Sequence, residues 1–96
     1  MEILVTYDVA TDTAAGTRRL RRVAKTCEAF GQRVQDSVFE CSVNDAQYEQ
    51  LKHRLTSIAK EEEDSLRFYR LLEPRERYVE SFGRRPAFDL HEPLIL

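Results

Sequence analysis

The sequence predicts an α+β fold in which two helices cover one face of an antiparallel sheet. Three observations support this prediction. The chain has 96 residues, enough for one domain and too few for two. Its hydrophobic fraction, 42%, is that of an ordinary globular protein. Along the chain, strand-like apolar segments are interrupted twice by segments with the helical period.

The first two elements are a strand and a helix. Residues 2–8, EILVTYD, are apolar or branched at nearly every position, which predicts a central strand buried on both faces. Apolar residues then recur every three or four positions, which predicts a helix over 14–30. Asp12 or Thr13 can cap its start, and Gly31 can end it by adopting left-handed backbone.

The middle of the chain predicts two further strands and a second helix. Residues 33–43, RVQDSVFECSV, resemble a strand whose alternation changes phase near Asp36, so we expect a kink, a bulge or two short strands. Asn44 and Gln47 have the spacing of a capping box. The second apolar stripe consists of Tyr48, Leu51, Leu55 and Ile58.

A last clear strand covers 65–72, SLRFYRLL, and ends before Pro74. With two strands in the middle, the order is βαββαβ, that of a ferredoxin-like sandwich. We therefore expect a ferredoxin-like domain over 1–75 and a C-terminal strand and arm over 76–96. Residues 78–82, YVESF, predict an additional edge strand that packs on a partner subunit, and a chain this small gains buried area by forming a homodimer.

Composition and motifs limit the function. No apolar run approaches about 18 residues and no secretory signal is visible, so we expect a cytoplasmic protein with no membrane partner. Cys27 and Cys41 lack metal-ligand spacing, which predicts reduced thiols, with Cys27 packed in the core. The chain contains no GxxxxGK[ST], GxGxxG, HExxH or CxxC motif, which excludes the sites that these motifs form.

Asp8 ends the predicted central strand at the rim of the sheet, where a ligand can reach it. Hard cations such as magnesium prefer carboxylate oxygens and keep several waters, so Asp8 is a candidate metal ligand. The alternative is an aspartate that shapes the loop after the strand, and position alone favours this alternative. For Asp12, helix capping is the simpler interpretation.

A basic run, TRRLRRVAK over 17–25, lies on the first predicted helix. Helical spacing places three basic residues on one face and two beside it: Arg18, Arg22 and Lys25, flanked by Arg19 and Arg21. Such a cluster attracts phosphate backbones without reading bases. The alternative is a solvated helix face, but the absence of acidic residues over 13–27 favours nucleic-acid binding.

Other polar and aromatic residues give weaker signals. Strand arginines 33, 67 and 70 need an outward face or an acidic partner, which Glu40 or Asp64 could supply. Aromatic residues 39, 68 and 69 could stack bases, although strand aromatics are more often part of the core. His53, on the polar face of the second helix, and His91, in the tail, have no acid–base partners in the pattern.

Four segments, VTYDV, RRVAK, FGQRVQDSVFE and DSLRFYRL, occur in this order over roughly 2–72. Together they resemble the CRISPR-associated protein two family, the small partner of the CRISPR integrase, CRISPR-associated protein one. The most specific stretch contains Gly31, Arg33, Gln35 and Ser37 to Glu40. The resemblance implies a ferredoxin-like fold and a homodimer in which each C-terminal strand joins the partner's sheet.

The resemblance also implies a site. Asp8 matches the family's acid, and in the dimer the two acids face each other across the two-fold axis and can hold magnesium. The cation would relieve their repulsion and polarise a phosphate. Family positions implicated in nuclease activity or nucleic-acid contact match Tyr7, Arg22, Arg33, Ser37 and Phe39. Asp12 sits where the family often has a further acid, although the loop TDTAAGT is longer here.

Three functions remain open. The first is a metal-dependent endonuclease or endoribonuclease that cuts duplex DNA or RNA with Asp8 as its metal ligand. The second is a scaffold for spacer acquisition, in which the dimer bridges integrase subunits and its arginines hold duplex nucleic acid. The third is a stand-alone, toxin-like metal-dependent endoribonuclease of the same fold. We expect the scaffold to be the biological role, with magnesium-dependent nuclease activity beside it; only the scaffold should survive loss of Asp8.

Overall fold

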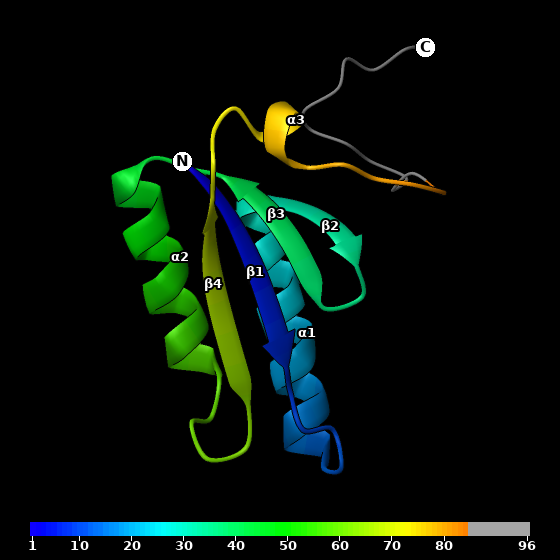
Figure 1. Cartoon of the computed structure of the whole chain (residues 1–96). Coiled ribbons are helices and arrows are strands. Elements are labelled where there is room, and N and C mark those ends of the chain that lie inside the picture. The colour runs from blue at the N-terminus through cyan, green and yellow to red at the C-terminus, as the bar shows by residue number, and fades with distance from the viewer. Residues whose placement is uncertain (85–96) are drawn as a thin grey trace.

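A computed structural model describes residues 1–84 of the chain, and these residues form an antiparallel sheet with two helices on one face (Figure 1). In chain order the elements are β1 (Glu2–Asp8), α1 (Ala14–Phe30), β2 (Gly31–Gln35), β3 (Val38–Ser42), α2 (Asp45–Ile58), β4 (Ser65–Leu71) and the single-turn α3 (Arg75–Tyr78). The strand order is β2-β3-β1-β4, with every neighbouring pair antiparallel. The predicted ferredoxin-like sandwich is confirmed.

Strand β1 lies at the centre of the sheet, between β3 and β4. Its alternate residues Ile3, Val5 and Tyr7 are buried beneath the two helices. Leu4 is only partly buried and Asp8 is exposed, because α1 and α2 cover one face and leave the other open. The prediction that β1 is buried on both faces was therefore wrong: its composition did not reveal that the sandwich has two layers.

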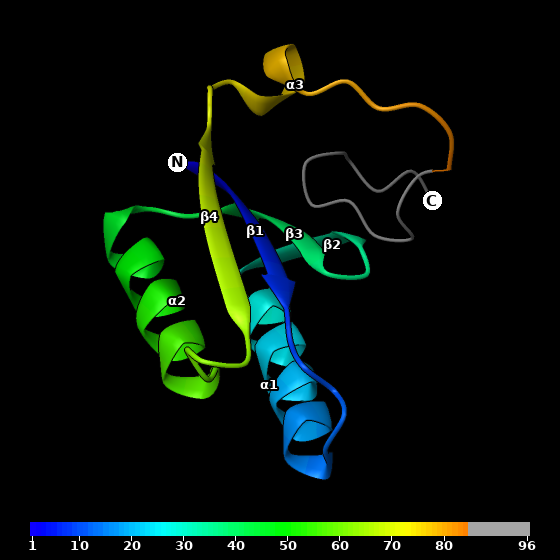
Figure 2. The same cartoon turned by 60° about the horizontal axis from the view of Figure 1, so that its bottom comes forward.

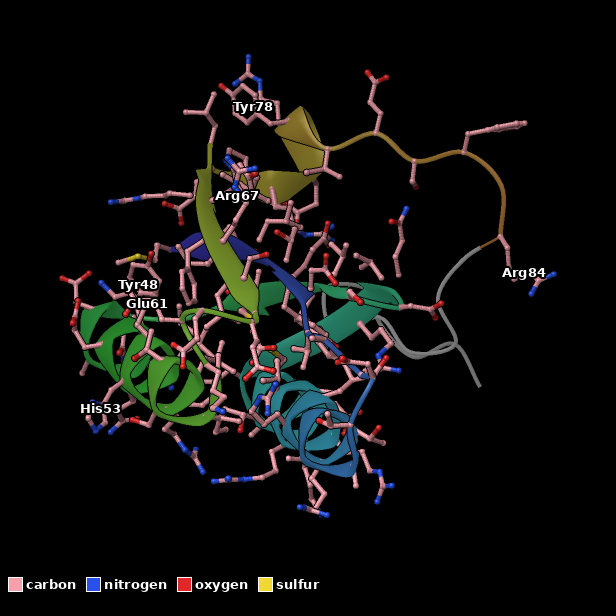
Figure 3. All side chains as sticks on the ribbon, turned by 90° about the horizontal axis from the view of Figure 1, so that it is seen from below. Tyr48, His53, Glu61, Arg67, Tyr78 and Arg84 are labelled. Carbon is pink, nitrogen blue, oxygen red and sulfur yellow. The ribbon has the colours of Figure 1, made fainter. Side chains whose placement is uncertain are left out.

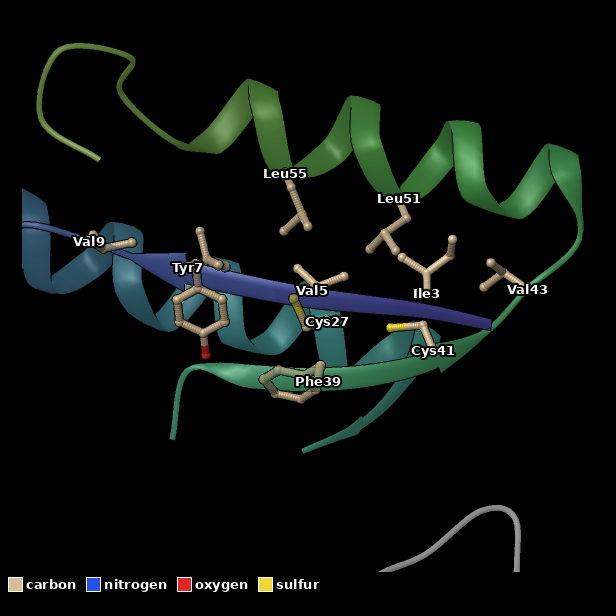
Figure 4. Packing of buried hydrophobic residues seen from close by; sticks show 11 residues of the cluster. Ile3, Val5, Tyr7, Val9, Cys27, Phe39, Cys41, Val43, Leu51 and Leu55 are labelled. Atoms are coloured by element: carbon tan, nitrogen blue, oxygen red, sulfur yellow. The ribbon is translucent and has the colours of Figure 1, made fainter. Parts of the chain in front are cut away.

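The core fills the space between the sheet and the helices (Figure 4). Its buried members are Ile3, Val5, Tyr7, Val9, Val23, Cys27, Phe39, Cys41, Val43, Leu51 and Leu55. Leu51 and Leu55 point from α2 towards β1, and each such leucine contributes roughly 1.5–3 kcal/mol through burial. Burial also raises the pKa of the Cys27 and Cys41 thiols to about 12, so both pack as small apolar groups, as predicted for Cys27.

The ends of α1 follow from local chemistry. Thr13 is the N-cap, and its Oγ1 accepts a hydrogen bond from Gly16 N at 3.0 Å, while Asp12 does not cap the helix. Gly31 follows the helix as predicted, but its backbone is extended (φ −169°) rather than left-handed. The glycine is needed because a Cβ there would overlap the carbonyl oxygen of Glu40 and lie 2.6 Å from Cys41 Sγ.

The phase change predicted near Asp36 corresponds to a turn between two short strands, with a register shift between Arg33 and Gln35. Helix α2 begins with the predicted capping box. Asn44 Oδ1 accepts from Gln47 N at 2.8 Å, and Asn44 N donates to Gln47 Oε1 at 2.9 Å. Both predictions succeeded because they rest on contacts between near neighbours in sequence.

The C-terminal segment differs from its prediction. Tyr78 ends α3, and residues 79–84 have no regular secondary structure, so the edge strand predicted over 78–82 is not formed within this single chain. Pairing of this segment with a second subunit, and the domain division at residue 75, stay predictions. The predicted arm and His91 fall in 85–96, outside the described residues.

Helix α3 lies beyond the end of β4, near the start of β1 (Figure 2). Arg75 Nη1 donates to Glu40 Oε1 at 2.9 Å, and both side chains are largely buried, with exposures of 13% and 12%. This ion pair fastens α3 to β3. Within the described part of the chain, no helix combines the length and apolar character needed to cross a membrane.

Candidate functional site

Asp8 is the last residue of β1 and pairs in register with Ser65, the first residue of β4. Because side chains alternate along a strand, Asp8 points to the face opposite the buried Tyr7, away from α1 and α2. The carboxylate is exposed, and among residues 1–84 no hydrogen bond or ion pair engages it. An incoming ligand can therefore reach it.

The turn between β2 and β3 is held beside this end of β1. Tyr7 N donates to the carbonyl oxygen of Ser37 at 3.1 Å, and the Tyr7 hydroxyl donates to the carbonyl oxygen of Asp36 at 3.2 Å. Ser37 is thus brought near the end of β1, and its supporting role stays a prediction. The predicted supporting residues Tyr7 and Phe39 are buried instead, and their rings stack with centroids 6.2 Å apart.

These two rings support the strand end from the helical side. Burial raises the pKa of Tyr7, an effect opposed by the charge of nearby Arg33. Tyr7 therefore stays protonated and keeps donating to the turn. It positions the rim of the sheet and does not share the exposed face with Asp8.

The loop that follows Asp8 is anchored by Asp64, a residue that was predicted only as a possible partner of the strand arginines. Asp64 Oδ1 accepts from Ala10 N at 3.1 Å, and Oδ2 accepts from Arg19 Nε and Lys60 N, each at 2.8 Å. The Asp64 side chain is fully buried from solvent. The Arg19 guanidinium lowers the pKa of Asp64 to about 2, so the carboxylate stays ionised at neutral pH.

The pairing with Asp64 changes the interpretation of Arg19, which was predicted to bind nucleic acid. Arg19 is only 9% exposed, and Glu63 also lies 3.9 Å from its guanidinium. Its donors are directed at acidic side chains within the fold, so it does not join the exposed basic residues. The helical spacing could not show this, because Asp64 lies 45 positions away in sequence.

The acidic partners proposed for the strand arginines were also wrong. Asp64 binds Arg19, and Glu40 binds Arg75. Arg33 instead lies 3.7 Å from Glu28, with its guanidinium 5.1 Å from the centre of the Phe39 ring. Its side chain is 45% exposed, so part of it still faces solvent.

The remaining predicted nucleic-acid-binding residues are exposed on α1: Arg18, Arg22 and Lys25. None of the three makes an ion pair within residues 1–84, in contrast to Arg19 and Arg33. The structure thus leaves these three cations available on one helical surface.

The fit of a magnesium ion depends on Asp8. Its exposed carboxylate offers the oxygen ligand that hard cations prefer. Residues 1–84 contain no cluster of three or more histidine, cysteine, aspartate or glutamate side chains that could hold a metal ion. Asp12 is exposed in the loop before α1. One chain therefore contributes a single carboxylate at this end of β1, and waters, a phosphate or a second chain would have to complete the site.

Comparisons with known proteins identify the family of the chain. The family described as CRISPR associated protein Cas2 matches residues 1–78. The chain is 58% identical to "CRISPR-associated endoribonuclease Cas2 1" of Moorella thermoacetica, over all of both chains. It is 54% identical to "CRISPR-associated endonuclease Cas2" of Halalkalibacterium halodurans, over 99% of each chain.

Solved structures give the same result. The crystal structure of Streptococcus pyogenes Cas2 at pH 6.5 superimposes with a TM-score of 0.77 and 58% sequence identity. The match covers 86% of the present chain and 100% of the other. Sequence motifs, fold and relatives agree, and the chain belongs to the Cas2 family of CRISPR-associated proteins.

Proposed function

We propose that this chain is a CRISPR-associated nuclease subunit that acts in spacer acquisition as a homodimer, binding duplex nucleic acid and bridging integrase subunits. The observation that carries the proposal is Asp8, an exposed carboxylate without a partner among the described residues, at the rim of the open sheet face. The names of two relatives, an endoribonuclease and an endonuclease, support nuclease chemistry. Family membership supports the integrase partner.

A homodimer is supported by the open face and the C-terminal segment. Several large apolar side chains outside the helical layer are exposed, among them Leu72 at 68% and Phe82 at 93%. Exposed apolar side chains of this size favour association, and a second copy would bury them. The dimer would also supply a second Asp8, and with it a second carboxylate.

The chemistry proposed for Asp8 is magnesium-dependent hydrolysis of a phosphodiester bond. When bound, magnesium polarises a phosphate oxygen and lowers the pKa of a coordinated water. Asp8 would hold the ion through its carboxylate oxygens. Asp64 and the turn at Ser37 would keep the end of β1 in place, because Asp64 accepts a hydrogen bond from Ala10 N and the Ser37 carbonyl accepts one from Tyr7 N. The residues of this chain would thus bind the ion and hold the end of β1 in position.

Nucleic acid would be held by the unpaired cations on α1, Arg18, Arg22 and Lys25. Contacts of this kind neutralise phosphates and carry no sequence information, which suits a protein that accepts duplexes of any sequence. The binding residues lie on the helical layer and Asp8 on the open face, so single substitutions should separate binding from cleavage.

The test compares wild type with Asp8→Asn on labelled RNA and labelled duplex DNA, with magnesium or with EDTA. We expect cleavage that needs magnesium and falls at least about 100-fold in Asp8→Asn, because the substitution removes a charged metal ligand. Duplex binding in EDTA should be unchanged. Equal cleavage by the two proteins would contradict the role of Asp8, and duplex binding without cleavage by either protein would leave the scaffold role as the whole function.

A further inference from the structure

We propose that the groove between α1 and α2 binds a phosphodiester backbone, with α2 supplying a second basic wall opposite the known run on α1. The proposal rests on the proposed function in one respect, since it takes nucleic acid to be the partner. It adds a site, the inter-helix groove, and two residues of α2, Arg54 and His53, that the sequence pattern did not connect with binding.

The groove is an open depression of about 800 Å³ along the seam between the two helices. Polar and charged side chains from both helices line it: Arg22, Lys25, Thr26 and Glu28 from α1, and His53, Arg54 and Ser57 from α2. Figure 3 views the molecule from below, along the two helices, and nitrogen-tipped side chains gather on the side of the helices that faces away from the sheet; His53 is labelled on α2.

The charges in the groove favour an anion. Arg22, Lys25 and Arg54 are cationic, and Glu28 is the single acidic residue in its lining. Glu28 lies 3.7 Å from the guanidinium of Arg33, which offsets part of its charge. Within the described residues, none of the three groove cations forms an ion pair. Elsewhere on the same surface Lys52 and Lys60 each lie 3.0 Å from a glutamate.

Arg54 is held in place without being neutralised. Its guanidinium lies 5.7 Å from the centre of the Phe30 ring, at the C-terminal end of α1. An aromatic face positions a cation and leaves its N–H donors available. Arg54 can therefore present these donors to a phosphate from the wall opposite Arg22 and Lys25.

The basic surface continues along the seam, which suits a polymer better than a single phosphate. Arg22 and Ile58 also line a neighbouring depression of about 440 Å³, together with Arg18 and Lys60. From Arg18 to Lys25 the helix rises about 10 Å. Successive phosphates of one strand can thus contact cations along α1 while Arg54 contacts the same strand from α2.

His53 and Ser57 complete the α2 wall of the groove. Of the two, His53 can donate to a phosphate oxygen through a ring N–H. The Ser57 hydroxyl donates to the carbonyl oxygen of His53 at 2.6 Å, which fixes the serine and leaves the imidazole free to turn towards a ligand. His53 therefore has a defined place in the site despite having no catalytic partner.

The test compares Arg54→Gln with Lys52→Gln as the matched control. Both residues lie on α2, both substitutions remove one positive charge, and each removes one cation–aromatic contact, to Phe30 for Arg54 and to Tyr48 for Lys52. Lys52 lies outside the groove lining. Dissociation constants are measured by fluorescence anisotropy on labelled duplex DNA and labelled single-stranded RNA, in EDTA, over a range of salt concentrations.

We expect Arg54→Gln to weaken binding about 5- to 10-fold and to reduce the salt slope by about 1, as loss of one phosphate contact requires. Arg22→Gln should do the same, Arg54→Lys should keep most of the affinity, and Lys52→Gln should bind like wild type. Circular dichroism melting of each variant checks that it is folded, and Arg54→Met keeps the test valid if Arg54→Gln does not fold.

Two results would overturn the groove and leave the proposed function intact. One is wild-type affinity and salt slope in Arg54→Gln together with weakened binding in Arg22→Gln, which would confine the phosphate contacts to α1. The other is equal weakening in Arg54→Gln and Lys52→Gln, which would indicate a general charge effect. Failure of wild type to bind either nucleic acid would overturn the proposed function and the groove together. If the substitutions weaken the binding of only one nucleic acid, this result would support binding in the groove and identify that nucleic acid as the ligand.

Discussion

Two carboxylates at the same end of the sheet have opposite surroundings. Asp64 is fully buried and accepts hydrogen bonds from Ala10 N, Arg19 and Lys60 N. Asp8 ends β1 opposite Ser65, the residue next to Asp64, and is exposed without a partner among residues 1–84. The Asp64 carboxylate is occupied by hydrogen bonds within the fold, whereas the Asp8 carboxylate is available to a ligand.

The same contrast separates the basic residues of α1. Arg19 is paired with Asp64 and Glu63, whereas Arg22, one turn further along, faces the inter-helix groove without an acidic partner in the described chain. A charge that the fold has already neutralised contributes to stability, and a charge left free stays available to a ligand. The comparison therefore assigns opposite consequences to neighbouring substitutions of the same type.

The largest effect on stability is expected for Asp64→Ala. The substitution removes an acceptor from two backbone N–H groups and leaves the Arg19 guanidinium without its main partner. We expect Tm to fall by roughly 5–10 °C, measured by circular dichroism or calorimetry. The control is Asp12→Ala, which removes an exposed acid and should leave Tm nearly unchanged.

An unchanged Tm in Asp64→Ala would contradict the structural role of Asp64, because it would show that the buried network does not stabilise the loop after Asp8. A fall of the same size in Asp12→Ala would also contradict it. In that case any acid near the start of α1 would matter equally, through the overall charge of this region.

A smaller effect is expected in the pH dependence of stability. The pKa of Asp64 is lowered to about 2 in the folded protein, from an ordinary value of 3.8. A lowered folded pKa stabilises the protein above the unfolded pKa, and this contribution is lost as pH falls through the folded value. The difference in Tm between wild type and Asp64→Asn should therefore be constant above pH 5 and shrink as pH falls towards 2.

The pH series is best recorded at constant ionic strength, because the Glu63–Arg19 contact is also electrostatic. A Tm difference that stays constant down to pH 2 would show that the ionised carboxylate is not what Asp64 contributes. A difference that grows on acidification would give the opposite sign and contradict the lowered pKa.

The contrast between local and distant contacts also explains what the sequence could predict. The bounds of α1, 14–30, were predicted correctly, because apolar periodicity and the cap at Thr13 are properties of neighbouring residues. The capping box at Asn44 and the two strands on either side of Asp36 followed for the same reason. Exposed Asp8 was found because a strand end is visible in the pattern.

What the sequence could not predict depends on residues far apart in the chain. Arg19 has the same local context as Arg22, and its burial depends on the return of the chain at Asp64, 45 positions later. Likewise, the inter-helix groove depends on α1 and α2 packing side by side, which places Arg54 opposite Lys25. Periodicity identifies the face of a helix but not the element that packs beside it.

The smallest effect is expected from Asp8→Asn in the absence of metal. The Asp8 carboxylate is exposed and has no described partner, so its removal should change Tm by less than about 2 °C. Adding magnesium should then give the two proteins different Tm values. At a concentration equal to Kd, mass action adds about 0.4 kcal/mol, or roughly 2–3 °C for a domain of this size. Wild type should show this rise and Asp8→Asn should not, with calcium-free buffer and EDTA as the reference. An equal rise in both proteins would place the metal elsewhere, and Asp8 would then be exposed for another reason than metal binding.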